Sequence, residues 1–141
     1  MKLDFEDFKK MYAETMMYYQ EIEHDVKLIY AFMLSGDVDE NIDDIETITL
    51  GQMINRLRDL DYSDDKPYIS KEDYNFLSQI CKNRNHWAHM VFIKFMYIPN
   101  WFSSSAYLKQ CDELISDHER VKRASQILEN IRVEYCTKHK R

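Results

Sequence analysis

The sequence contains little glycine and little proline, with two residues of each in a chain of 141. β-Sandwiches and barrels need many tight turns, and these two residue types supply much of the turn chemistry. Their scarcity argues against an all-β fold and favours long helices joined by few turns. The chain is 45% hydrophobic and 13% aromatic, which is enough for a core and argues against disorder. The length fits a single domain over residues 1–141.

A long hydrophobic run is also missing. No segment approaches the ~18 uncharged apolar residues of a membrane-spanning helix. The N-terminal stretch MKLDFEDFKK is charged throughout and lacks the apolar region of a signal peptide. The three cysteines, Cys81, Cys111 and Cys136, are odd in number and lack the spacing of metal ligands. We therefore expect a cytoplasmic protein with reduced thiols, no membrane partner, no metal and no cofactor.

Basic residues are scarce in the first half of the chain. Residues 1–75 carry 19 acids and 8 bases, whereas residues 76–141 carry 6 acids and 11 bases. The whole chain, with a net charge of −6, is a poor non-specific binder of nucleic acids, but its second half can hold a phosphate backbone. Two solvated helix faces of opposite sign explain the asymmetry equally well.

Apolar residues recur at steps of three and four, which predicts an all-α bundle of four main helices. The predicted helices cover about residues 4–34, 47–60, 70–98 and 106–135. An acidic loop is expected at about 35–47 and a basic tail at about 136–141. Gly36 is a natural stop for the first helix. Ser70 can cap the third helix, with Asp73 three residues on as in a capping box.

The end of the predicted third helix, MVFIKFMYI at residues 90–98, is apolar nearly all round. A helix that contacts the core on one side does not require this pattern. Either this stretch is buried on every side, or part of it faces another subunit.

The stretch RNHWAH, Arg84 to His89, stands out within the third helix. At 100° per residue, Arg84 falls on the apolar seam, and Asn85 and His89 lie one turn apart on its flank. His86 points away from the core, and Trp87 lies at the edge of the seam and is expected to pack. An arginine on an apolar seam needs a counter-charge, so a salt bridge to an acid of another helix is the purely structural interpretation.

These residue types also form a minimal set for cleaving RNA without a metal. Arg84 offers a permanent cation with a forked donor set that suits phosphate. His89 can transfer protons near neutral pH, and Asn85 can orient its ring through a hydrogen bond. One group would then handle the proton of the 2′-hydroxyl or the leaving group, while the other stabilises charge on the phosphorus.

Arg84 to His89 resembles the R-x4-6-H motif of HEPN domains, the higher eukaryotes and prokaryotes nucleotide-binding superfamily. Asn85 matches the polar residue that often follows the arginine, and TLGQMINRL upstream resembles the helix that precedes the motif helix. The resemblance implies a metal-independent endoribonuclease in a toxin–antitoxin or phage-defence system. It makes Arg84 and His89 the catalytic pair and Asn85 their polar partner.

The resemblance further implies a homodimer in which two motifs face one composite cleft. An apolar stretch after the motif would suit such an interface. Val91 stands where one toxin subgroup carries a tyrosine that a partner nucleotidyltransferase modifies, which argues against that type. The alternative function is a non-catalytic HEPN-like module that binds a nucleotide, an RNA or a partner protein, as an antitoxin or accessory subunit.

Other polar residues are weaker candidates. His86 and His89 are spaced like two zinc ligands, but no cysteine or carboxylate completes a set. His86 is instead a candidate second proton-transfer group. A path for RNA along the basic second half would involve His86, Lys82, Lys109, Arg120, Lys122 and Arg123. A solvated helix face is the alternative interpretation of these charges.

Overall fold

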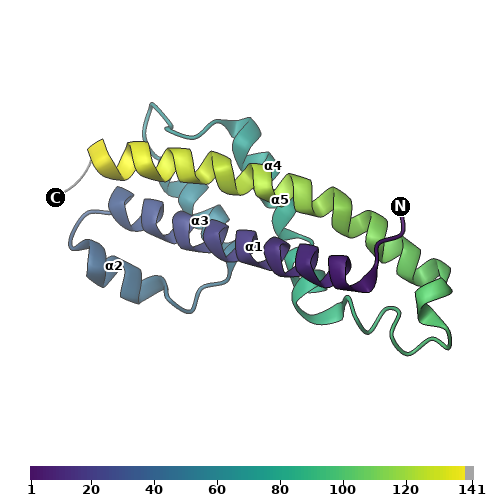
Figure 1. Cartoon of the computed structure of the whole chain (residues 1–141). Helices are drawn as coiled ribbons and strands as arrows, with labels where there is room; N and C mark the ends of the chain where they lie inside the picture. Colours follow the sequence, from purple (N-terminus) through teal and green to yellow (C-terminus); the bar gives the residue numbers. More distant parts are fainter. Residues whose placement is uncertain (139–141) are drawn as a thin grey trace.

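The computed structural model describes residues 1–138, and within this range it contains helices and turns but no strand. The five α-helices are α1 (Phe5–Met33), α2 (Val38–Ile45), α3 (Leu50–Asp61), α4 (Lys71–Cys81) and α5 (Ser105–Lys138) (Figure 1). A π-helical turn (His86–Met90) and a 3-10 turn (Trp101–Ser103) lie between α4 and α5. The all-α prediction is confirmed, but the described residues form five α-helices, where four main helices were predicted.

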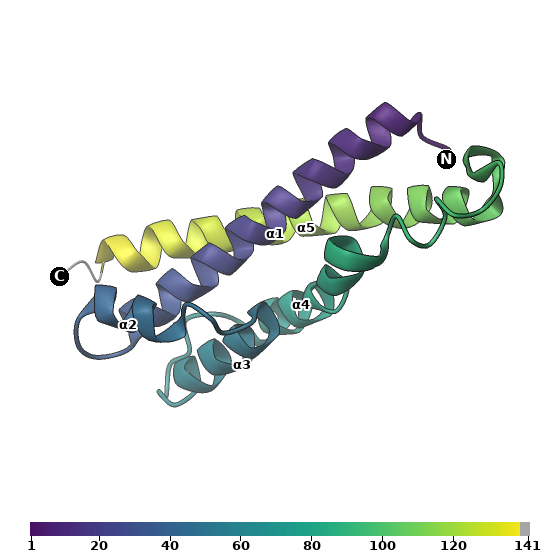
Figure 2. The ribbon, with the colours of Figure 1, turned by 90° about the horizontal axis from the view of Figure 1, so that it is seen from below.

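The two longest helices, α1 and α5, run side by side in the same direction (Figures 1 and 2). Contacts between them advance together along both helices, from Leu3 with Tyr107 to Glu21 with Ser125. The apolar stripe of α1 supplies many of the buried residues of this pair: Phe8, Tyr19, Ile22, Val26 and Ile29. Two parallel helices need a long connection, because the chain must return from the end of the first to the start of the second. Residues 34–104 make this connection and form a second layer.

That second layer consists of α2, α3 and α4, which lie together on one side of the α1–α5 pair (Figure 2). Its buried apolar residues complete the core: Leu50, Met53, Ile54, Leu57, Tyr74, Leu77 and Ile80. Ser70 caps α4 by accepting a hydrogen bond from the Asp73 amide at 3.1 Å, as its sequence position predicts. Among the described residues, none of the helices is both long enough and apolar enough to span a membrane.

The acidic stretch predicted as a loop at about 35–47 contains the short helix α2, so that prediction is wrong. Asp37 caps α2 and accepts hydrogen bonds from the amides of Asp39 at 2.8 Å and Glu40 at 3.2 Å. Acids in a first turn are favoured by the helix dipole. The Asn41 side chain of α2 donates to the Ala31 carbonyl at 3.0 Å and fixes the helix against the end of α1.

The predicted third helix does not continue to residue 98, because α4 ends at Cys81. Two tyrosines of α1 contact the chain at and after this break. Tyr19 donates its hydroxyl to the Ile80 carbonyl at 3.1 Å, and Tyr12 donates to the Trp87 carbonyl at 2.8 Å. The Ile80 carbonyl also accepts a hydrogen bond from the Asn83 amide at 3.2 Å, as in a tight turn. Beyond the break, residues 83–97 form irregular helical turns around the π-helical turn.

The last helix begins and ends close to its predicted limits. α5 covers Ser105–Lys138, against the predicted 106–135. The first part of the expected basic tail, residues 136–138, therefore belongs to α5. Residues 139–141 of that tail lie outside the described residues.

Candidate functional site

The residues of the RNHWAH stretch lie in a short irregular region, residues 83–90, which we call the motif segment. It is fastened to α5 by the buried carboxylate of Asp117. Asp117 accepts hydrogen bonds from the Trp87 indole at 2.7 Å and from the Asn83 amide at 3.1 Å, and it pairs with Arg120 at 3.6 Å. Trp87 is fully buried, which confirms its predicted packing role.

The π-helical turn changes the relation between Arg84 and His89. In an α-helix, residues five apart point about 140° away from each other. A π-helical turn is wider, because its hydrogen bonds join residues five apart, and it brings such residues toward the same side. Because the turn begins two residues after Arg84 and contains His89, we expect a smaller angle between these two residues than in a regular α-helix. Turns of this kind occur frequently at functional sites.

The predicted hydrogen bond between Asn85 and His89 is absent from the described part of the chain. Both side chains are exposed, and neither makes a hydrogen bond there. The prediction assumed an α-helical spacing of four, whereas the π-helical turn changes that relation. The His89 ring is thus open to solvent rather than held by Asn85.

Arg84 pairs with Glu23 of α1, across 3.8 Å between Nη2 and Oε2. This separation exceeds hydrogen-bonding distance, and the Arg84 side chain is 33% exposed. Glu23 also contacts Lys27 at 3.5 Å, so its charge is shared between two cations. The predicted intramolecular salt bridge exists, but exposed pairs of this kind hold a side chain weakly.

The Arg84 side chain lines a hollow of about 380 Å³ between α1, the start of α3 and the motif segment. Asn85 lines the same hollow, and so does the thiol of Cys81. Burial, together with the charge of Glu23, raises the pKa of the Cys81 thiol to about 12, although Arg84 acts in the opposite direction. The thiol is therefore protonated at neutral pH, which excludes it as a nucleophile there.

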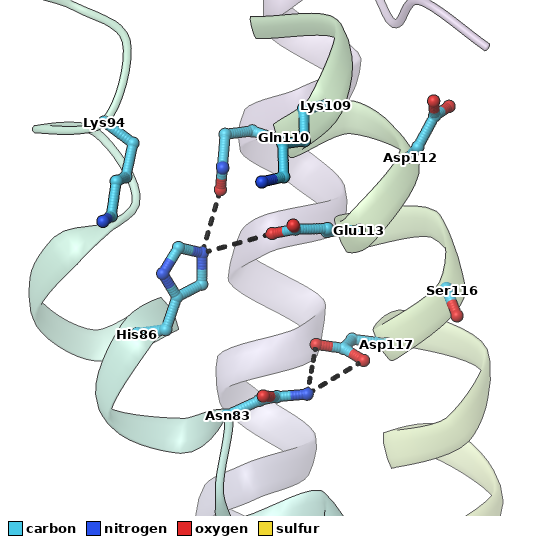
Figure 3. Close-up of a pocket in the computed structure, with 9 residues that line it drawn as sticks. All are labelled: Asn83, His86, Lys94, Lys109, Gln110, Asp112, Glu113, Ser116 and Asp117. Carbon is cyan, nitrogen blue, oxygen red and sulfur yellow. Dashed lines mark hydrogen bonds and ion pairs between the residues drawn. The ribbon is translucent and has the colours of Figure 1, made fainter. Parts of the chain in front are cut away.

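His86 faces a second hollow, of about 680 Å³, between the motif segment and the first half of α5 (Figure 3). Its Nε2 lies 2.9 Å from Oε1 of Gln110 and 3.8 Å from Oε2 of Glu113. The ring also packs edge-on against Trp87, with the centroids 4.7 Å apart. The prediction that His86 points away from the core is wrong, because the segment is not a regular α-helix.

The predicted site residues therefore do not all line the same hollow. Arg84 and Asn85 share the first hollow, His86 lines the second, and His89 lines neither of the two. Lys94 lines the His86 hollow and was missed by sequence reasoning. The available signal was its position, as the single charge within the apolar run MVFIKFMYI.

The residues of the predicted basic path have different surroundings. Of its members, Lys109 lines the His86 hollow, whereas Arg120 is engaged by Asp117. Arg123 lies over the Phe76 ring, 4.2 Å from its centroid. Lys82 and Lys122 are exposed side chains outside the His86 hollow.

The apolar run after the motif is not buried on every side. Val91 and Phe95 enter the core, but several neighbours remain 39% to 85% exposed. We call these exposed residues the apolar patch: Met90, Ile93, Met96, Tyr97 and Ile98. When exposed apolar side chains form one contiguous surface, that surface commonly marks an interaction site.

Within residues 1–138, no group of three or more histidine, cysteine or acidic side chains is arranged to hold a metal ion. Comparisons with protein-family models, curated proteins and solved structures give no match to this chain. The geometry of the motif segment is therefore the basis for a functional conclusion.

Proposed function

We propose that this chain is a metal-independent endoribonuclease of HEPN type that serves as a toxin or phage-defence module. The observation that carries the proposal is the π-helical turn at His86–Met90, which overlaps the R-x4-H spacing from Arg84 to His89. The turn favours a common side for the two residues. A guanidinium and an imidazole that both reach solvent suit a phosphodiester substrate.

In the proposed reaction, His89 removes the proton from a ribose 2′-hydroxyl, and the 2′-oxygen attacks the adjacent phosphorus. The bond from phosphorus to the 5′-oxygen breaks, which leaves a 2′,3′-cyclic phosphate and a 5′-hydroxyl end. Arg84 stabilises the negative charge that builds up on the phosphoryl oxygens. Its loose pairing with Glu23 leaves it free to turn toward a more highly charged phosphate.

The proposed active form is a homodimer with a composite cleft. The apolar patch begins at Met90, directly after His89, so a second copy seated on it would approach the motif segment. Two-fold symmetry would then bring two sets of Arg84 and His89 together. The second His89 would supply the proton that the leaving 5′-oxygen takes up.

Cleavage of RNA by the purified protein tests the proposal. The wild type is expected to cut single-stranded RNA in the presence of EDTA and to leave cyclic phosphate ends. Arg84→Ala and His89→Ala should each abolish cutting, while circular dichroism reports an unchanged fold. His118→Ala, on α5, is the matched histidine control and should retain activity. Strict dependence on a divalent metal ion would contradict the mechanism.

One observation favours a second candidate, a non-catalytic HEPN-like module that binds a nucleotide, an RNA or a partner protein such as a toxin. Arg84 already has an acidic neighbour in Glu23, and the first half of the chain is strongly acidic. Expression in growing cells separates the candidates. A ribonuclease toxin slows growth only when Arg84 and His89 are intact, whereas an accessory module leaves growth unchanged with either sequence.

A further inference from the structure

The His86 hollow contains polar groups that the proposed ribonuclease reaction does not use. The motif segment and the turns after it contribute Asn83, His86 and Lys94 to one wall, and α5 contributes Lys109 and Glu113 to the other. Figure 3 shows His86 between the two lysines, with Nε2 directed toward α5. The other ring nitrogen, Nδ1, lies on the side of Lys94.

The acids of this hollow are already engaged. Asp117 takes two hydrogen bonds and the charge of Arg120. Glu113 faces the His86 ring at 3.8 Å. Asp112 contacts the amino group of Met1 and is 58% exposed, so water and salt screen its charge.

The bases are not engaged. Lys94 and Lys109 line the hollow, and among the described residues neither side chain makes a hydrogen bond or an ion pair. Lys109 lies one helical turn before Glu113, within reach of an i,i+4 pair, yet the two do not form one. The hollow contains three acids and two lysines, but the groups that have no partner and are available to a ligand are the two lysines.

We infer that the His86 hollow is a phosphate subsite, in which Lys94 and Lys109 contact the anion from opposite walls. His86 completes the subsite by presenting Nδ1, which becomes a donor when the ring is protonated. The inference rests on the proposed function, because the phosphate is assigned to an RNA strand that passes along the motif segment. It identifies a contact for a phosphate other than the one cleaved.

Substitution of Glu113 should change the affinity for RNA in the opposite direction to substitution of the two lysines. Its carboxylate lies beside His86 and one turn from Lys109, so it repels an incoming phosphate. Glu113→Gln keeps the shape of the side chain but removes this repulsion. A phosphate subsite therefore predicts stronger binding for Glu113→Gln and weaker binding for Lys94→Gln and Lys109→Gln, whereas a purely structural hollow predicts no such opposition.

The experiment measures the binding of a fluorescein-labelled single-stranded RNA by anisotropy, with all variants made in a His89→Ala background so that no strand is cut. Lys94→Gln and Lys109→Gln should each weaken binding several-fold and reduce the slope of log affinity against log salt by about 0.7. Glu113→Gln should tighten binding several-fold. Lys71→Gln, at the start of α4, removes the same charge outside the hollow and is the matched control.

A second measurement identifies the source of the phosphate. Inorganic pyrophosphate is titrated into the same protein while the His86 ring signals are followed by NMR. If pyrophosphate displaces the RNA and moves these signals, the subsite accepts free phosphate. If pyrophosphate does neither, while RNA moves the signals, the subsite accepts only the phosphate of a strand. The inference is overturned if the Lys94 and Lys109 variants bind RNA as the Lys71 variant does. That result is independent of whether the wild type cuts RNA, which alone decides the proposed function.

Discussion

At the scale of single residues, the pairing of Arg84 decides between a structural and a catalytic role. The ion pair with Glu23 is 3.8 Å long, both side chains are partly exposed, and Glu23 is shared with Lys27. Pairs of this kind contribute about 0–1 kcal/mol to stability. An arginine held so weakly remains available to a ligand.

Glu23→Gln is expected to leave stability almost unchanged and to strengthen RNA binding. The substitution removes the acid that competes with phosphate for Arg84, at a cost of under about 1 kcal/mol in the free energy of unfolding. Urea denaturation and RNA anisotropy measure the two effects, with Glu129→Gln on α5 as the control. A loss of 2 kcal/mol or more without a change in affinity would assign Arg84 to the fold.

Cys81 gives a prediction that depends on pH. Because burial and Glu23 raise its pKa from 9.0 to about 12, the unfolded thiol ionises first as pH rises. The folded state then binds the extra proton, so stability falls between about pH 9 and pH 12. Cys81→Ala should lose less stability than the wild type over this range. In the folded wild type, the thiol should react with a disulfide reagent far more slowly than in urea.

Rapid reaction of Cys81 with the reagent in the folded protein at neutral pH would contradict this account. Glu23→Gln and Arg84→Met serve as paired tests of its cause. The first should lower the pKa of the thiol, and the second should raise it, because Glu23 and Arg84 act on it in opposite directions.

At the scale of secondary structure, the Asp117 carboxylate connects α5 to the motif segment through hydrogen bonds. Asp117→Ala would leave the buried indole N–H of Trp87 without an acceptor, which lowers the free energy of unfolding by about 1–3 kcal/mol. Asp117→Asn keeps an oxygen for the indole and should be destabilised less. Urea unfolding followed by circular dichroism should rank the wild type above Asp117→Asn and Asp117→Ala last. An alanine variant as stable as the wild type would mean that the burial of Trp87 and the hydrogen bond from Tyr12 hold the segment without Asp117.

Local sequence patterns located the regular helices but not the break after Cys81. The three- and four-residue periodicity predicted α1, α3 and α5 closely, and Ser70 marked the start of α4. At and after the break the chain is contacted by Tyr19 and Tyr12, which donate to carbonyls 61 and 75 residues away along the chain. No local window contains both partners of such a bond, so periodicity extended the helix too far.

The same limit explains the candidate site. Arg84, Asn85 and His89 could be selected by residue type and spacing, but their directions depended on a helix geometry that the tertiary contacts changed. His86 was therefore assigned to solvent, although Gln110 and Glu113 of α5 receive it. Residues 35–47 were predicted as a loop because they are rich in acids. Acidic residues are common both in loops and in the first turn of a helix, so composition alone does not distinguish the two.

At the scale of the whole molecule, the apolar patch is the surface that a single copy leaves unexplained. Its residues are exposed beside the motif segment, although the same run supplies Val91 and Phe95 to the core. A second copy would remove this apolar area from water, at roughly 25 cal/mol per Å² buried. In the proposed homodimer, the association of two copies would also assemble the composite cleft.

Ile93→Lys is expected to separate the proposed dimer without unfolding it. Ile93 is 58% exposed, so a lysine there faces solvent in a monomer but meets apolar atoms in a dimer. Sedimentation equilibrium should show a dimer for the wild type and a monomer for the variant, with equal melting temperatures. Val133→Lys, at a 52% exposed position on α5, should remain dimeric. RNA cutting should fall with the dimer fraction if the active site is the proposed composite cleft, which needs two motif segments. A wild type that cuts RNA while monomeric would confine the chemistry to one Arg84 and one His89.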